Sequence, residues 1–70
     1  QVDRLAVFDD KVMIVDFKTN RPAAENPDEV PAVYVRQLSA YRKLLAAVYP
    51  KRKIETWILW TDTARLMEIA

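Results

Sequence analysis

The chain has 70 residues, a net charge of +1 and neither cysteine nor histidine. This length allows one small domain at most, or a piece of one, and the missing residue types exclude disulfides, thiolate metal sites and histidine as a general base or zinc ligand. A bound metal ion would therefore need oxygen ligands, which favours magnesium, manganese or calcium.

The first two predicted elements are strands that form a hairpin. Residues 3–8 and 11–17 are rich in β-branched and large apolar side chains, and Asp9-Asp10 stands between them as a turn candidate. A two-residue turn pairs Phe8 with Lys11, Leu5 with Ile14 and Asp3 with Asp16. Cβ atoms of directly opposed residues lie about 4.5–5.5 Å apart.

A loop and a long helix are expected next. Residues 19–31 hold three of the four prolines, and Asn26-Pro27-Asp28-Glu29 resembles the start of one helical turn. Apolar residues then recur at helical spacing from about Ala32 to Tyr49, before Pro50. The predicted packed face consists of Tyr34, Leu38, Tyr41, Leu45 and Val48.

Two further strands complete the prediction. Residues 54–60 are nearly all apolar, as in a covered strand, and residues 64–69 form a last strand after a turn. The order β-β-α-β-β places the chain in the α/β class. No apolar run approaches the length of a membrane span, so no membrane partner is expected.

The basic residues are concentrated in one segment. Residues 33–53 carry six bases and no acid: Arg36, Arg42, Lys43, Lys51, Arg52 and Lys53. This segment is either a solvated helix face whose cations complement the helix C-terminus or a surface that binds phosphates.

The charged residues within the predicted strands are the candidates for chemistry. Opposed carboxylates at Asp3 and Asp16 repel each other, and a divalent cation between them would make the interaction favourable. Lys18 lies on the same face as Asp16, because side chains two residues apart on a strand point the same way. The alternative is that the two aspartates are solvated strand ends, screened by Lys18.

Gln37, a polar residue of the predicted helix, helps to decide between a site and solvated strand ends. Gln37 falls near Tyr34 and Tyr41 on the face expected to pack on the sheet, where its amide needs hydrogen-bond partners. It either belongs to a site or is a boundary glutamine bonded to the backbone.

Together these residues resemble a known family. Asp3 on one strand, Asp16-Phe17-Lys18 on the next and Gln37-Leu38-Ser39-Ala40-Tyr41 on a helix are similar to the core of PD-(D/E)xK nucleases. The Gln-x-x-x-Tyr element narrows the resemblance to the RecB-like group. With Val2-Asp3-Arg4-Leu5, Val15 to Arg21 and Trp60-Thr61-Asp62, the chain looks most like the C-terminal nuclease domain of AddA-type helicase–nucleases.

The resemblance implies a fold, a site and a reaction. The fold would be a partial restriction-endonuclease-like core, with residues 1–70 a fragment of one nuclease domain. Asp3, Asp16 and the backbone carbonyl of Phe17 would bind Mg²⁺, which Mn²⁺ can replace, and Lys18 would position or activate the attacking water. Gln37 and Tyr41 would support the site and the nearby DNA.

The family's upstream helix and the ATP-driven helicase domains are expected outside this chain. The implied function is a cytoplasmic DNA exonuclease that processes double-strand breaks for recombinational repair, together with a second helicase–nuclease subunit. The alternative is a non-catalytic DNA-binding or scaffolding module with the same fold. Uncovered apolar surface would allow the fragment to self-associate.

Overall fold

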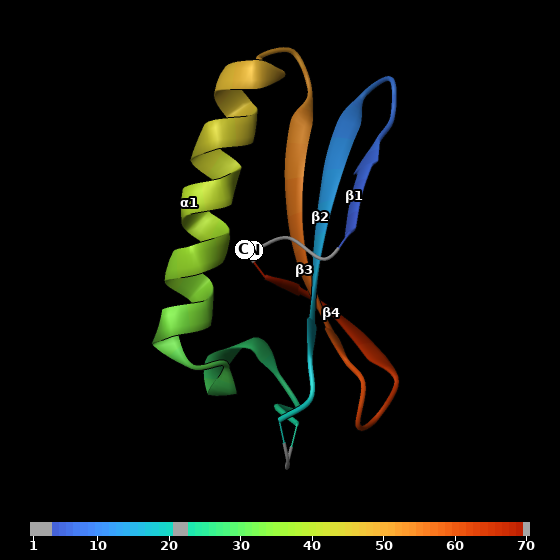
Figure 1. Ribbon diagram of the computed structural model, residues 1–70, viewed down its shortest axis with the longest axis vertical. Coiled ribbons are helices and arrows are strands. Elements are labelled where there is room, and N and C mark those ends of the chain that lie inside the picture. The colour runs from blue at the N-terminus through green and yellow to red at the C-terminus, as the bar shows by residue number, and fades with distance from the viewer. Residues whose placement is uncertain (1–3, 21–22, 70) are drawn as a thin grey trace.

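A computed structural model describes residues 4–20 and 23–69, which form one mixed sheet with a long helix beside it (Figure 1). The predicted order of elements is confirmed. In chain order they are β1 (Arg4–Val7), β2 (Lys11–Lys18), the 3-10 turn η1 (Pro27–Glu29), α1 (Ala32–Val48), β3 (Lys53–Trp60) and β4 (Arg65–Ile69). Among the described residues, no helix is both long and apolar enough for a membrane span.

The four strands lie in the sheet in the order in which they occur in the chain. β1 and β2 are antiparallel, β2 and β3 are parallel, and β3 and β4 are antiparallel. Parallel neighbours need a crossover connection, which here runs through η1 and α1. This connection leads α1 back along one side of the sheet (Figure 1).

The predicted register of the first hairpin is confirmed over the described residues. Leu5 is paired with Ile14, and the backbone N–H of Phe8 donates to the carbonyl of Lys11 at 2.8 Å, which leaves Asp9 and Asp10 in the turn. The last described pair is Arg4 with Val15. Asp3 lies outside the described residues.

The core lies between α1 and the sheet face that it covers. Even-numbered residues of β2 and β3 point to this face, because side chains alternate along a strand. Their register pairs Val12 with Ile54 and Asp16 with Ile58, and all four are buried. Leu38, 1% exposed, is the residue of α1 that is fully buried against them.

The predicted packed face of α1 is only partly correct. Leu38 is buried and Tyr34, Tyr41 and Leu45 pack against the core, but Val48 is 65% exposed. α1 packs chiefly on β3 and less on β2, so residues on one flank of the helix do not meet a strand. Gln37 also departs from the prediction, since it is exposed instead of lying on the packed face.

The opposite face of the sheet carries apolar residues flanked by charged ones such as Arg4 and Glu68, and no described element covers it. We call it the uncovered face; its apolar residues are Ala6, Met13, Val15, Phe17, Trp57, Leu59 and Leu66. Phe17 and Leu66 are 40% and 48% exposed, respectively. Figure 1 shows α1 on the other side of the sheet.

Candidate functional site

Asp16 and Lys18 are brought together at the end of β2. The Asp16 side chain points toward the core and the residue is only 5% exposed, whereas Lys18 is half-buried at the last position of the strand. The ammonium Nζ of Lys18 lies 3.2 Å from Oδ2 of Asp16. A carboxylate at this depth is costly unless it is paired, so the lysine satisfies a charge that the fold has removed from water.

The backbone of Lys18 is fixed by the segment that follows β3. Its carbonyl accepts hydrogen bonds from the N–H of Thr61 at 2.9 Å and from the hydroxyl of Thr61 at 3.2 Å. These bonds extend the parallel pairing of Lys18 with Trp60 by one residue. The strand end that carries both charged side chains is therefore attached to the centre of the sheet.

The side chain of Lys18 has an aromatic neighbour on α1. Nζ lies 4.1 Å from the centroid of the Tyr34 ring, within the range of a cation–π contact. The Tyr34 hydroxyl donates to Oδ1 of Asn20 at 3.0 Å. From the sequence, Tyr34 is predicted only as a packing residue, and Asn20 is part of a loop and of the segment that resembles the nuclease family, with no role of its own.

Some of the described residues carry oxygen atoms of the kind that bind divalent metal ions. Asp16 supplies a carboxylate. The carbonyl of Lys18 points to β3, and successive carbonyls of a strand point in opposite directions. The carbonyl of Phe17 therefore points toward the β1 side. Within residues 4–20 and 23–69, no group of three or more acidic side chains forms a complete ligand set. The donor chemistry fits a hard cation, with Asp3 outside the described residues.

The two helix residues of the predicted motif have different environments. Tyr41 is half-buried and packs against the core. Gln37 is exposed, one helical turn before Tyr41, and does not contribute to the core. The structure thus places Asp16, Lys18 and Tyr34 together, while Gln37 faces solvent.

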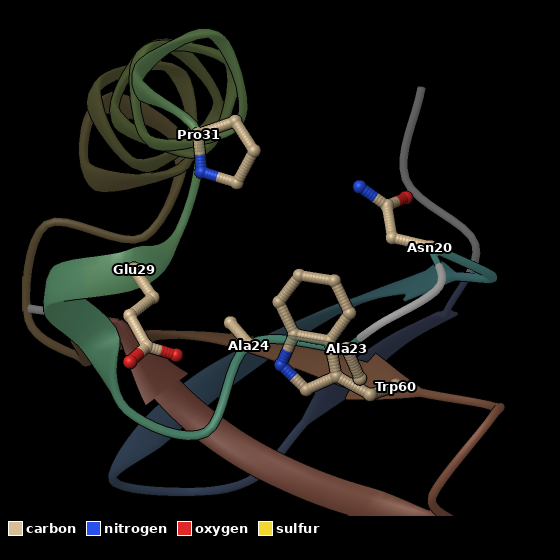
Figure 2. Close-up of a pocket in the computed structure, with 6 residues that line it drawn as sticks. All are labelled: Asn20, Ala23, Ala24, Glu29, Pro31 and Trp60. Carbon is tan, nitrogen blue, oxygen red and sulfur yellow. The ribbon is translucent and has the colours of Figure 1, made fainter.

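A small cavity adjoins this site, with a volume of about 200 Å³ (Figure 2). It is lined by Asn20, Ala23, Ala24, Glu29, Pro31 and Trp60. Asn20 connects the cavity to Tyr34, and Trp60 is the β3 partner of Lys18. The Nε1 of Trp60 is buried and makes no hydrogen bond within the described part of the chain.

Comparison with known proteins gives a family for this arrangement. The sequence of residues 1–67 matches the family PD-(D/E)XK nuclease superfamily, and members of this superfamily generally use divalent metal ions. Neither a curated protein nor a solved structure matches the chain. With a match that covers nearly all of its residues and a mixed sheet that brings Asp16 and Lys18 together, the chain belongs to the PD-(D/E)XK nuclease superfamily.

Proposed function

We propose that the chain is the core of a Mg²⁺-dependent DNA exonuclease domain. The observation that carries this proposal is the buried Asp16 carboxylate with the Lys18 ammonium 3.2 Å away, in a nuclease-superfamily chain. A half-buried ammonium beside a buried carboxylate at a strand end can orient a water molecule or a phosphate oxygen next to that carboxylate.

The proposed ligands are Asp3, Asp16 and the carbonyl of Phe17. The pairing of Leu5 with Ile14 and of Arg4 with Val15, continued by one position, would set Asp3 opposite Asp16. A divalent ion held there would polarise a phosphate oxygen and offset the repulsion between the two carboxylates.

Lys18 has the proposed role of positioning or activating the attacking water. The water oxygen would form a bond to phosphorus and lose a proton to solvent, while the bond from phosphorus to the leaving sugar oxygen breaks and that oxygen takes up a proton from solvent. The ammonium would stabilise the negative charge on the phosphoryl oxygens in between. An ammonium is suited to this because it is a compact point charge with three donors.

Metal titration tests this assignment directly. Mn²⁺ added to the chain is expected to bind, and Asp16→Ala is expected to abolish that binding. Asp16→Asn is the closer control, since it keeps the shape of the side chain and removes only the charge. Equal Mn²⁺ affinities for the wild type and both variants would show that Asp16 is not a ligand.

We further propose the cellular context that the resemblance implies. In it the domain belongs to an ATP-dependent, AddA-type helicase–nuclease that acts with a second subunit in the cytoplasm and processes DNA ends for recombinational repair. ATP would serve only the helicase part. The test is a full-length protein with Lys18→Ala, which is expected to unwind DNA and to lose cleavage.

A second candidate function is a non-catalytic module that binds DNA. It is favoured by the exposure of Arg36, Lys43, Lys51 and Lys53 in a segment without acidic residues. DNA binding that depends on salt but proceeds unchanged in Asp16→Ala, with no cleavage by the wild type, would support this function over the first.

A further inference from the structure

We propose that Tyr34, held by Asn20, is a positioning residue for the Lys18 ammonium. This inference rests on the proposed nuclease function and extends it to a residue of α1 for which sequence patterns gave only a packing role. The proposal rests on two contacts of the Lys18 ammonium. Its Nζ lies 3.2 Å from Oδ2 of Asp16 and 4.1 Å from the centroid of the Tyr34 ring.

A lysine side chain needs such a second contact to be fixed in direction. It has a long, flexible stem, and one ion pair leaves its ammonium several arrangements around the carboxylate. The face of an aromatic ring carries negative potential and attracts a cation from a defined direction. Together the carboxylate and the ring therefore define where the ammonium lies.

The ring is itself held in place. Tyr34 is half-buried against the core, and its hydroxyl donates to Oδ1 of Asn20 at 3.0 Å. Asn20 follows Lys18 by two residues, so the chain that carries the lysine also supplies the acceptor that orients the ring. Three successive contacts thus join four side chains, from Asp16 to Lys18, Tyr34 and Asn20, between the end of β2 and the first turn of α1.

The two contacts of the ammonium differ in how they respond to a bound cation. A divalent ion on Asp16 would take part of the carboxylate charge that attracts Lys18. The Tyr34 ring is neutral and keeps its attraction for the ammonium. Lys18 would therefore keep its contact with the Tyr34 ring when the proposed site holds a cation.

Three variants test the contributions of the Tyr34 ring and of its hydroxyl separately, and a fourth is a control. Tyr34→Leu removes both, while Tyr34→Phe and Asn20→Ala each remove only the hydrogen bond. Tyr49→Leu is the control: it replaces a tyrosine by leucine just after the C-terminal end of α1, where the Tyr49 ring lies 5.2 Å from the Arg52 guanidinium. Thermal unfolding of each variant shows which are folded.

The first readout is the proton chemical shift of the Lys18 CεH₂ group in chain labelled with ¹³C-lysine. The ring current of Tyr34 is expected to shift it upfield in the wild type. The shift should be lost in Tyr34→Leu, reduced equally in Tyr34→Phe and Asn20→Ala, and unchanged in Tyr49→Leu. This readout needs neither metal nor DNA.

The second readout is DNA cleavage with Mg²⁺ by the full-length protein that carries each variant. A misplaced lysine should lower kcat by about 10-fold to 100-fold in Tyr34→Leu and leave KM for DNA unchanged. Tyr34→Phe and Asn20→Ala should have the same intermediate kcat, and their combination should be no worse than either alone, because both remove one bond.

The outcomes distinguish the two proposals. A full-length wild-type protein that does not cleave DNA overturns the nuclease function, and the Lys18 chemical shift alone then tests whether Tyr34 positions the ammonium. A wild type that cleaves, with Tyr34→Leu folded and equally active, overturns the positioning role. If Tyr34→Leu does not fold, unequal effects of Tyr34→Phe and Asn20→Ala on the Lys18 shift contradict the proposal.

Discussion

The backbone carbonyl of Lys18 accepts two hydrogen bonds from Thr61, one from its N–H and one from its hydroxyl, although 43 positions separate the two residues. The residue that carries the proposed catalytic ammonium is thus attached through its backbone to the end of β3. Its side chain contacts Asp16 on its own strand and Tyr34 on α1. Three elements fix one lysine.

Replacement of Lys18 should remove catalysis and keep DNA binding. Proton transfer or water positioning by one side chain is worth about 10²–10⁴-fold in rate, and Lys18→Ala is expected to lower DNA cleavage by that factor. Lys11→Ala is the matched control, because Lys11 begins the same strand and pairs with Glu55 at 3.7 Å. Cleavage rates and binding of the same labelled DNA check both; equal loss of activity in the two variants would contradict a special role for Lys18.

The core contact of α1 can be measured with two leucines of the same helix. Leu38 is 1% exposed and Leu44 is 64% exposed. Leu38→Ala should lower the free energy of unfolding by about 2–5 kcal/mol through lost burial and the cavity left behind. Leu44→Ala should change it by less than about 0.5 kcal/mol. Urea unfolding followed by tryptophan fluorescence gives both values, and similar values would mean that α1 packs through a different face.

The exposed bases of α1 should make DNA binding sensitive to salt. Lys43→Gln and Arg36→Gln are each expected to weaken binding and to reduce the slope of log affinity against log salt by about one. Ser39→Gln is the control, since it places the same side chain at an exposed position of α1 without removing a charge. Fluorescence anisotropy with labelled single-stranded DNA at several salt concentrations measures the slope. An unchanged slope in both charge variants would assign these bases to a solvated face.

The uncovered face should cause the isolated chain to self-associate. One row across this face runs Arg4, Val15, Trp57 and Glu68, with a cation at one edge and an anion at the other. Two copies related by a two-fold axis along the strands would set Arg4 of each against Glu68 of the other. Sedimentation velocity should show a mass that rises with concentration.

Two lysine substitutions locate the contact. Leu66→Lys introduces a charge on the uncovered face and should give a monomer at all concentrations. Val48→Lys introduces the same charge at the C-terminal end of α1, at a residue that is 65% exposed, and should leave the association unchanged. If Val48→Lys rather than Leu66→Lys abolished the association, the copies would meet through the helix.

Most of the fold could be predicted because local signals agree. Asp9-Asp10 between two β-rich runs fixed the hairpin register, and the spacing of Leu38 and Tyr41 with Pro50 after them fixed the extent of α1. The pair of Asp16 and Lys18 followed from strand alternation alone.

The errors and omissions have a common physical cause. Periodicity shows which residues share a side of a helix, but not over which strand the helix lies. Because α1 lies chiefly over β3, Gln37 and Val48 are exposed where packing was predicted. The contact of the Tyr34 ring with Lys18 joins residues of different elements, so no local sequence pattern contains it.

The parallel pairing of β2 with β3 also has a consequence for the order of folding. The hairpin of β1 and β2 closes over a two-residue turn, so its pairing is local and fast, whereas β3 can join β2 only after the loop and all of α1 have been brought into place. The bonds of Thr61 to Lys18 and the Tyr34 contact both wait for that step. We therefore expect the site to be complete only once β3 has joined the sheet.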